Sequence, residues 1–240
     1  MIETVNYRSA CVTDAYICKG GGPEVWEPRF TYRGFRYAQV TGLPLEPSPE
    51  TIVSQVLHTA APMSGTFECS DPLINPILKN VVWGQRSNMH SVLTDCPQRD
   101  ERLGWMGDAQ AFAPTSIWNM DMALFFTKWM RDIVDSQHEN GATTGVCPRI
   151  VVDGAGRAAW ADAVTIIPWQ VYRYYGDTRI LEEPASVGVR HHRTGTAAGS
   201  RRQCGQGCRQ ARLSSQHGTD STWLIQTWIG GKTSRDWHIT

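Results

Sequence analysis

The sequence predicts a mainly α-helical protein that begins with a β segment, and two observations support this fold class. In residues 1–60, aromatic and β-branched side chains alternate with polar ones, which is the period of a β-strand. From Thr66 onward, apolar residues recur every three to four positions, which is the period of an amphipathic helix. The first 60 residues hold too few strands to close a sandwich by themselves.

The β segment carries two local signals. The aromatic residues of 30–37 change phase at Gly34, and a glycine at such a phase change predicts a β-bulge inside one strand spanning 25–40. The run Gly-Gly-Gly-Pro at 20–23 predicts a turn. No helix-opening pattern follows that run, so it does not predict a phosphate-binding loop.

A first helix is expected after Ser70, which we expect to be its N-cap, with Asp71 and Pro72 in the first turn. Its apolar positions form one broad stripe, which predicts a face packed on a core. The stripe consists of Leu73, Ile74, Ile77, Leu78, Val81 and Val82.

Three more helices are expected at about 108–119, 121–137 and 161–175. Gly176 predicts the end of the last one. The helix expected at 121–137 has apolar residues at core spacing, and we expect them to be buried. These are Leu124, Phe125, Trp129 and Ile133.

The chain changes character near Pro184. Residues 184–240 hold eight Lys and Arg against two Asp, a balance of +6, so residues 1–183 hold 15 basic against 21 acidic side chains. Between residues 190 and 222 the only large apolar side chain is Leu213, which is too little to offset the entropy of ordering. We therefore expect residues 1–60, residues 61–183 and a disordered basic tail over 184–240.

Charge and cysteine content exclude several classes of protein. The formal net charge is zero, and the six arginines of 190–212 have no interleaved aromatic residues, so a nucleic-acid partner is not expected. No run approaches about 18 apolar residues, so a membrane span is not expected. Cys204 and Cys208 lack a zinc-site spacing, and we expect no metal and no other cofactor.

The expected compartment is the cytoplasm. The seven cysteines are odd in number and irregularly spaced, which favours a reducing compartment over a disulfide framework. The first eight residues also lack the pattern of a secretory signal.

Chemistry concentrates in residues 94–108, where four carboxylates, two arginines and a tryptophan fall within fifteen positions. Pro97 and Gly104 interrupt helical periodicity, so we expect a loop that leads into the next helix. Crowded carboxylates raise one another's pKa, which suits a general acid. Arginine donors and a tryptophan face suit the hydroxyls and C–H surface of a sugar, so the cluster predicts a carbohydrate site.

This segment resembles the signature of bacterial α-L-rhamnosidases, glycoside hydrolase family 78. Residues 95–109 read Asp-Cys-Pro-Gln-Arg-Asp-Glu-Arg-Leu-Gly-Trp-Met-Gly-Asp-Ala. Further family-like segments occur in the same order, at 25–37, 67–73, 81–86, 160–169 and 174–177. The resemblance covers about residues 12–183.

The resemblance implies an incomplete (α/α)6 barrel preceded by part of a β-sandwich, in a glycosidase that removes terminal α-L-rhamnose with inversion. By position, Glu101 is identified as the general acid. The positions that match the family's substrate-binding residues are Asp95, Arg99, Trp105, Asp108 and Trp160. We expect Glu101 to hold its proton tightly among Asp95, Asp100 and Asp108. The implied partners are rhamnose-containing glycosides.

The chain departs from the family pattern after Glu183. The resemblance places the general base on a later loop, and no position of this chain matches it. Residues 223–236 are again faintly family-like, which leads to the hypothesis of a shifted reading frame. We also expect the family's sandwich to begin before Met1. The alternative to a rhamnosidase is a non-catalytic remnant that binds rhamnosides, and we expect little or no turnover from this chain.

Cys96 has two interpretations as well. No histidine accompanies it in the motif, so a packed cysteine is favoured over a nucleophilic thiol.

Overall fold

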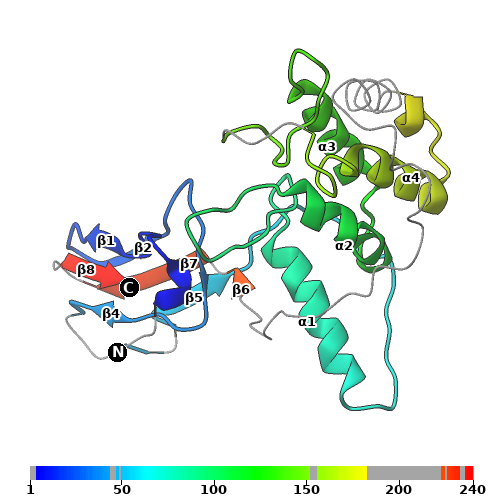
Figure 1. The fold of residues 1–240 in the computed structure, drawn as a ribbon. Coiled ribbons are helices and arrows are strands. Elements are labelled where there is room, and N and C mark those ends of the chain that lie inside the picture. The colour runs from blue at the N-terminus through cyan, green and yellow to red at the C-terminus, as the bar shows by residue number, and fades with distance from the viewer. Residues whose placement is uncertain are drawn as a thin grey trace.

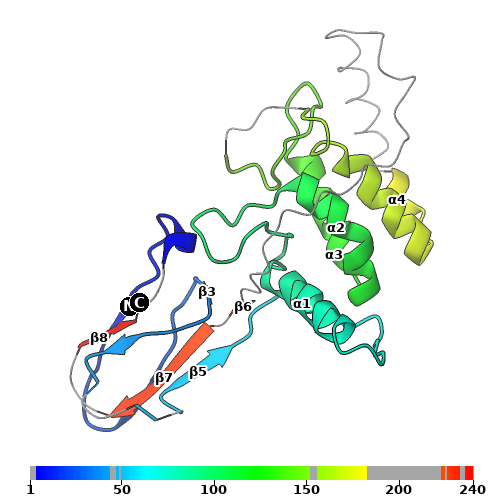
Figure 2. The same ribbon diagram turned by 60° about the horizontal axis from the view of Figure 1, so that its bottom comes forward.

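The computed structural model describes residues 4–43, 47–48, 50–151 and 156–182, together with the backbone of three strands between 223 and 239. The β-strands gather in one part and the labelled α-helices in another (Figures 1 and 2). None of the described helices is long and apolar enough to cross a membrane.

The β part consists of short antiparallel ladders. A 3₁₀ helix, η1 (Val5–Tyr7), precedes them. The strands are β1 (Asp14–Ile17), β2 (Pro23–Trp26), β3 (Gly34–Phe35), β4 (Val40–Thr41), β5 (Ile52–Gln55), β6 (Trp223–Leu224), β7 (Gln226–Lys232) and β8 (Asp236–Ile239). Their order is β1-β8-β4 in one sheet and β2-β7-β5 in another, and β3 pairs with β6. Each ladder therefore joins strands from the two ends of the chain.

The strands β6, β7 and β8 lie within residues 184–240, where a basic tail is expected. In the register of β8, Tyr16 lies opposite Trp237, and in that of β7, Val25 lies opposite Gly230. Apolar and β-branched residues return after Thr222, and such residues suit a paired strand. Most of the basic stretch, with Cys204 and Cys208, lies outside the described residues.

The predicted strand over 25–40 is interrupted rather than bulged. β2 ends at Trp26, and the next ladder begins only at Gly34. Pro28 has no backbone N–H to donate to a ladder, and Phe30 has a φ of 59° and an exposed side chain. A left-handed residue in this position turns the chain and ends the strand. The turn predicted at 20–23 is present, with Gly20 and Gly21 at positive φ.

The four helices that the periodicity predicts are present among the described residues. They are α1 (Ile74–Ser87), α2 (Met106–Asn119), α3 (Ala123–Asp135) and α4 (Ala163–Tyr175). α4 ends at Gly176, whose φ of 68° is the left-handed C-cap conformation. α1 begins four residues after Ser70, and its N-cap is Leu73, so the predicted Ser70 cap is wrong. The Asp71 carboxylate accepts a hydrogen bond from Leu73 N (2.8 Å), which forms a turn just before the helix.

The core lies among α2, α3 and α4. Its fully buried side chains include Met106, Ala113, Phe126, Trp129, Met130, Ile133, Val164 and Ile167. Leu124 is 86% exposed, so its predicted burial is wrong, and Phe126 occupies the core instead. Phe125, Trp129 and Ile133 are buried as predicted.

α1 packs on this core through buried polar side chains and, from its apolar stripe, through Val82. Gln85 is buried, donates to Ser116 O (3.2 Å) and accepts from Asn119 Nδ2 (2.9 Å). Ile74 and Ile77 of the stripe are exposed and line an open apolar hollow of about 810 Å³. The predicted burial of that part of the stripe is therefore wrong.

Candidate active site

The signature loop is fixed by backbone hydrogen bonds at both of its ends. Within it, Asp95 N donates to Leu103 O (3.1 Å). Across from it, Cys147 N donates to Gly104 O (2.9 Å), and Met106 N donates to Gly145 O (2.9 Å). The loop thus enters α2 as a short antiparallel bridge with residues 145–147.

Position 104 requires glycine for steric reasons. A Cβ built on Gly104 would lie 2.2 Å from Cys147 O, a backbone atom that is itself fixed by the bridge. The Cys147 thiol is buried nearby, and burial raises its pKa to about 12. The glycine lets the two segments approach closely enough to hold the loop.

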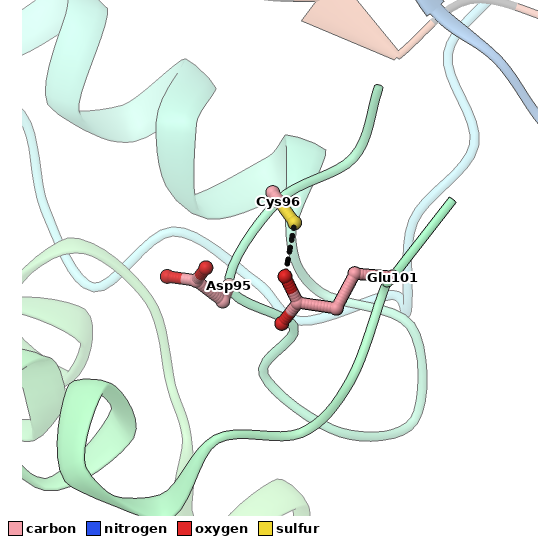
Figure 3. A group of neighbouring side chains, drawn as sticks. All are labelled: Asp95, Cys96 and Glu101. Atoms are coloured by element: carbon pink, nitrogen blue, oxygen red, sulfur yellow. Dashed lines mark hydrogen bonds between the residues drawn. The ribbon is translucent and has the colours of Figure 1, made fainter. Parts of the chain in front are cut away.

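Glu101 lies at the centre of the loop, with three donors aimed at its carboxylate. Trp105 Nε1 donates to Oε1. Arg99 donates to Oε2 from Nε (3.0 Å), and the Cys96 thiol donates to the same oxygen (3.6 Å, Figure 3). The Glu101 side chain is 17% exposed, so these contacts act in a partly desolvated environment.

Arg99 bridges the two carboxylates of the loop. Its Nη2 lies 2.8 Å from Asp95 Oδ2 and 2.7 Å from Glu101 Oε2. Asp100 turns away and accepts a hydrogen bond from Ser9 Oγ, which lowers the pKa of Asp100. The expected repulsion between like charges around Glu101 is thus relieved, because the Arg99 guanidinium contacts both the Glu101 and the Asp95 carboxylates.

Two tryptophans stand beside this group. The rings of Trp105 and Trp160 meet edge to face, with centroids 6.4 Å apart. Gly107, in the first turn of α2, lies so close to Trp160 that an added Cβ would lie 3.0–3.1 Å from its ring atoms. The Arg157 guanidinium covers the Trp160 ring at 4.7 Å.

Asp95 and Asp108 line a common cavity of about 470 Å³. It lies between α1 and α2, and Gln85, Asn88 and Phe112 also contribute to its wall. Carboxylates and amides beside an aromatic side chain suit a small polyhydroxylated ligand.

The β part holds the outer side of the loop. Tyr32 stacks on His90 at 4.2 Å, and the Arg102 guanidinium lies 4.8 Å from the Tyr32 ring centroid. Gly34 approaches Gln98 so closely that an added Cβ would lie 3.2 Å from its backbone. Burial lowers the pKa of His90, so the stack favours the neutral imidazole.

The group of Asp95, Cys96 and Glu101 does not suit a metal ion, although one ligand atom of each lies within 4.8 Å of the others. Arg99 already supplies the cation that both carboxylates contact. Burial raises the pKa of the Cys96 thiol to about 11, so the thiol beside Arg99 keeps its proton.

Two protein-family models match this chain. The model of the bacterial alpha-L-rhamnosidase 6 hairpin glycosidase domain matches residues 62–185, and that of the bacterial alpha-L-rhamnosidase concanavalin-like domain matches residues 1–58. The chain belongs to the bacterial α-L-rhamnosidase family. The expected incomplete (α/α)6 barrel, preceded by part of a sandwich, is confirmed.

Individual α-L-rhamnosidases are similar to this chain in sequence. A curated α-L-rhamnosidase of Streptomyces avermitilis is 48% identical over 182 residues, which cover 76% of this chain and 18% of the relative. One of Formosa agariphila is 43% identical over 182 residues, covering 75% of this chain and 20% of the relative. The chain therefore spans about a fifth of the length of these relatives.

Solved structures of the family agree. The crystal structure of the Streptomyces avermitilis α-L-rhamnosidase complexed with L-rhamnose has a TM-score of 0.80 and 45% identity, and the match covers 83% of this chain and 19% of that one. The structure of α-L-rhamnosidase from Dictyoglumus thermophilum has a TM-score of 0.67 and 44% identity, covering 72% and 19%.

Most of the site residues predicted for this α-L-rhamnosidase relative lie together. Asp95, Arg99, Glu101 and Trp105 form one hydrogen-bonded group, and Trp160 contacts its edge. Asp108 shares a cavity with Asp95. The site roles of these six residues stay predictions.

Two features of the site were missed at the sequence level. Cys96 is packed, as favoured, but its thiol also contacts Glu101, and only its place in the motif hinted at this. No sequence pattern indicated that Ser9 and Tyr32 contact the loop, because both lie more than 50 residues before it.

Proposed function

We propose that this chain carries the acid and sugar-binding part of an α-L-rhamnosidase site, specific for terminal non-reducing α-L-rhamnose and built for inversion. One observation carries the proposal. A partly buried Glu101 is held by Arg99 and Trp105, with Asp95 and Trp160 beside it. That combination offers a proton donor, charged hydrogen-bond partners and aromatic walls within one site.

In this proposal Glu101 protonates the glycosidic oxygen as the bond to the anomeric carbon breaks. Asp95 and Asp108 accept hydrogen bonds from the sugar hydroxyls, and Arg99 donates hydrogen bonds to them. Trp105 and Trp160 pack on the C–H face of the ring. The proposed partners are rhamnose-containing glycosides.

Inversion also needs a base carboxylate roughly 6.5–9.5 Å from the acid, with a water between them. Asp95 does not suit that role, because its oxygen lies within 4.8 Å of Glu101 and is bound by Arg99. We assign no base in this chain, and we propose that it turns over rhamnosides slowly or not at all.

The second candidate function is rhamnoside binding without catalysis. It is favoured by the geometry of Asp95, which lies too close to Glu101 to act as the base and is bound by Arg99. The two candidates share the sugar-binding residues and differ only in turnover.

The test combines calorimetric titration of the purified chain with L-rhamnose and an assay of rhamnose release from a sugar-linked rhamnoside. Trp160→Ala should weaken binding at least tenfold. Glu139→Gln, an exposed glutamate after α3, is the matched control for Glu101→Gln and should change nothing.

Turnover that falls about 10²–10⁴-fold in Glu101→Gln supports catalysis by this acid. Binding without turnover supports the binding remnant. If the chain neither binds L-rhamnose nor releases it, the proposal is wrong.

A further inference from the structure

The Cys96 thiol is the least expected of the three donors on Glu101. It is buried, with 6% of the residue exposed, and Sγ lies 3.6 Å from Glu101 Oε2. Figure 3 shows the thiol and the carboxyl facing each other, with Asp95 to one side. The proposed function gives this cysteine no role in binding or catalysis.

A general acid must exist in two protonation states, and its partners must tolerate both. Arg99 and Trp105 can only donate hydrogen bonds, because neither a guanidinium nor an indole N–H has an acceptor lone pair. When Glu101 is protonated, its O–H therefore finds no acceptor in either of them. In a partly desolvated site, an O–H without an acceptor disfavours the protonated state.

A thiol differs from both because sulfur accepts weakly as well as donating. The Cys96 thiol also keeps its hydrogen throughout the working pH range, since burial raises its pKa to about 11. It can therefore donate to the carboxylate and, after a rotation about its Cβ–Sγ bond, accept from the carboxylic acid.

We propose that Cys96 is a positioning residue that donates to ionised Glu101 and accepts the hydrogen of protonated Glu101, so that the acid retains a partner in both states. This inference rests on the proposed role of Glu101 as the proton donor. No covalent step and no external reagent are involved, because only the direction of one hydrogen bond reverses.

The charged groups around Glu101 leave this role to the thiol. Arg99 contacts both carboxylates of the loop, so Asp95 is already bound to a donor. Asp100 is turned to Ser9, and Arg102 lies over Tyr32. At the start of α2, Trp105 contributes a donor only.

The test follows the side-chain carboxyl of Glu101 by NMR in the full chain labelled with ¹³C-glutamate, titrated from pH 3 to pH 9. The Glu101→Gln variant identifies the resonance, because it removes that signal alone. Cys96→Ala and Cys96→Val remove the acceptor at smaller and larger volume, and Cys96→Ser keeps a group that both donates and accepts.

The charge-assisted bond from the thiol to the carboxylate is stronger than the bond that sulfur accepts from the acid. Both apolar variants should therefore raise the midpoint of Glu101 by about one pH unit, a tenfold gain of proton affinity, and the serine variant should restore it. Equal midpoints in all four proteins would overturn the proposal, as would a fall in the apolar variants. If one apolar variant fails to fold, the other decides.

The titration needs no turnover, so it separates this inference from the proposed function. If calorimetry detects no binding of L-rhamnose but the Glu101 midpoints shift as expected, the role of Cys96 stands and the proposed sugar site is wrong. Should turnover be present, the alkaline limb of its pH profile should shift with the same order of variants.

Discussion

The approach of the signature loop to residues 145–147 makes Gly104→Ala a sharp test of the structure. The new Cβ would lie 2.2 Å from Cys147 O, whereas an ordinary contact begins near 3.4 Å, so the segments must separate by about 1 Å. That separation breaks the bond from Cys147 N to Gly104 O and strains the bond from Met106 N to Gly145 O, both 2.9 Å.

The expected loss of stability follows from these two effects. Overpacking costs about 1–3 kcal/mol, and a buried backbone group left without its partner costs about 1–3 kcal/mol. The sum is about 2–6 kcal/mol, which lowers the urea midpoint by roughly 1–3 M at an m-value of about 2 kcal/mol/M.

The assay is urea unfolding followed by far-ultraviolet circular dichroism, with Gly84→Ala as the matched control. Gly84 lies within α1, and an added Cβ there meets no atom within 4 Å. Alanine in a helix is favoured over glycine by about 1 kcal/mol, so the control should gain stability. A Gly104→Ala midpoint equal to that of wild type would refute the close approach and the bridge built on it.

Three further predictions concern the core, the loop support and the aromatic wall. Phe126→Ala should cost about 3–5 kcal/mol in urea unfolding, whereas Leu124→Ala on the exposed face should cost almost nothing; similar losses would contradict the orientation of α3. His90, whose pKa is lowered by burial, binds a proton more readily in the unfolded chain, so its contribution is complete above about pH 6.5 and is lost as the pH falls towards its folded pKa. Unfolding of His90→Gln at pH 7.5 and 5.5 should thus show a weaker pH dependence than wild type, and an equal slope would count against the stack. Gly107→Ala should displace the Trp160 ring by a few tenths of an ångström and weaken L-rhamnose binding in calorimetry without unfolding the chain; unchanged affinity would remove Trp160 from the sugar site.

Helix positions were predictable because each depends on local sequence. The apolar period located all four helices within a few residues, and Gly176 marked the end of α4 through its left-handed conformation. Burial within a helix was less predictable. Leu124 and Phe126 are two positions apart, and which of them faces the core depends on where α2 and α4 lie.

The candidate site shows the same division. The motif placed Asp95, Arg99, Glu101 and Trp105 within one loop, so their grouping was predictable from their spacing. The pairing among them was not, since the crowding of like charges expected from the sequence became an Arg99 bridge once the loop had folded.

By itself, the sequence determined the fold class, the family and the residues that carry the proposed chemistry, because these depend on period and motif. The tertiary structure alone decided what Glu101 contacts and how the loop is held. Ser9, Tyr32 and Cys147 reach that loop from distant parts of the chain, and contacts across such separations form only when packing brings the segments together.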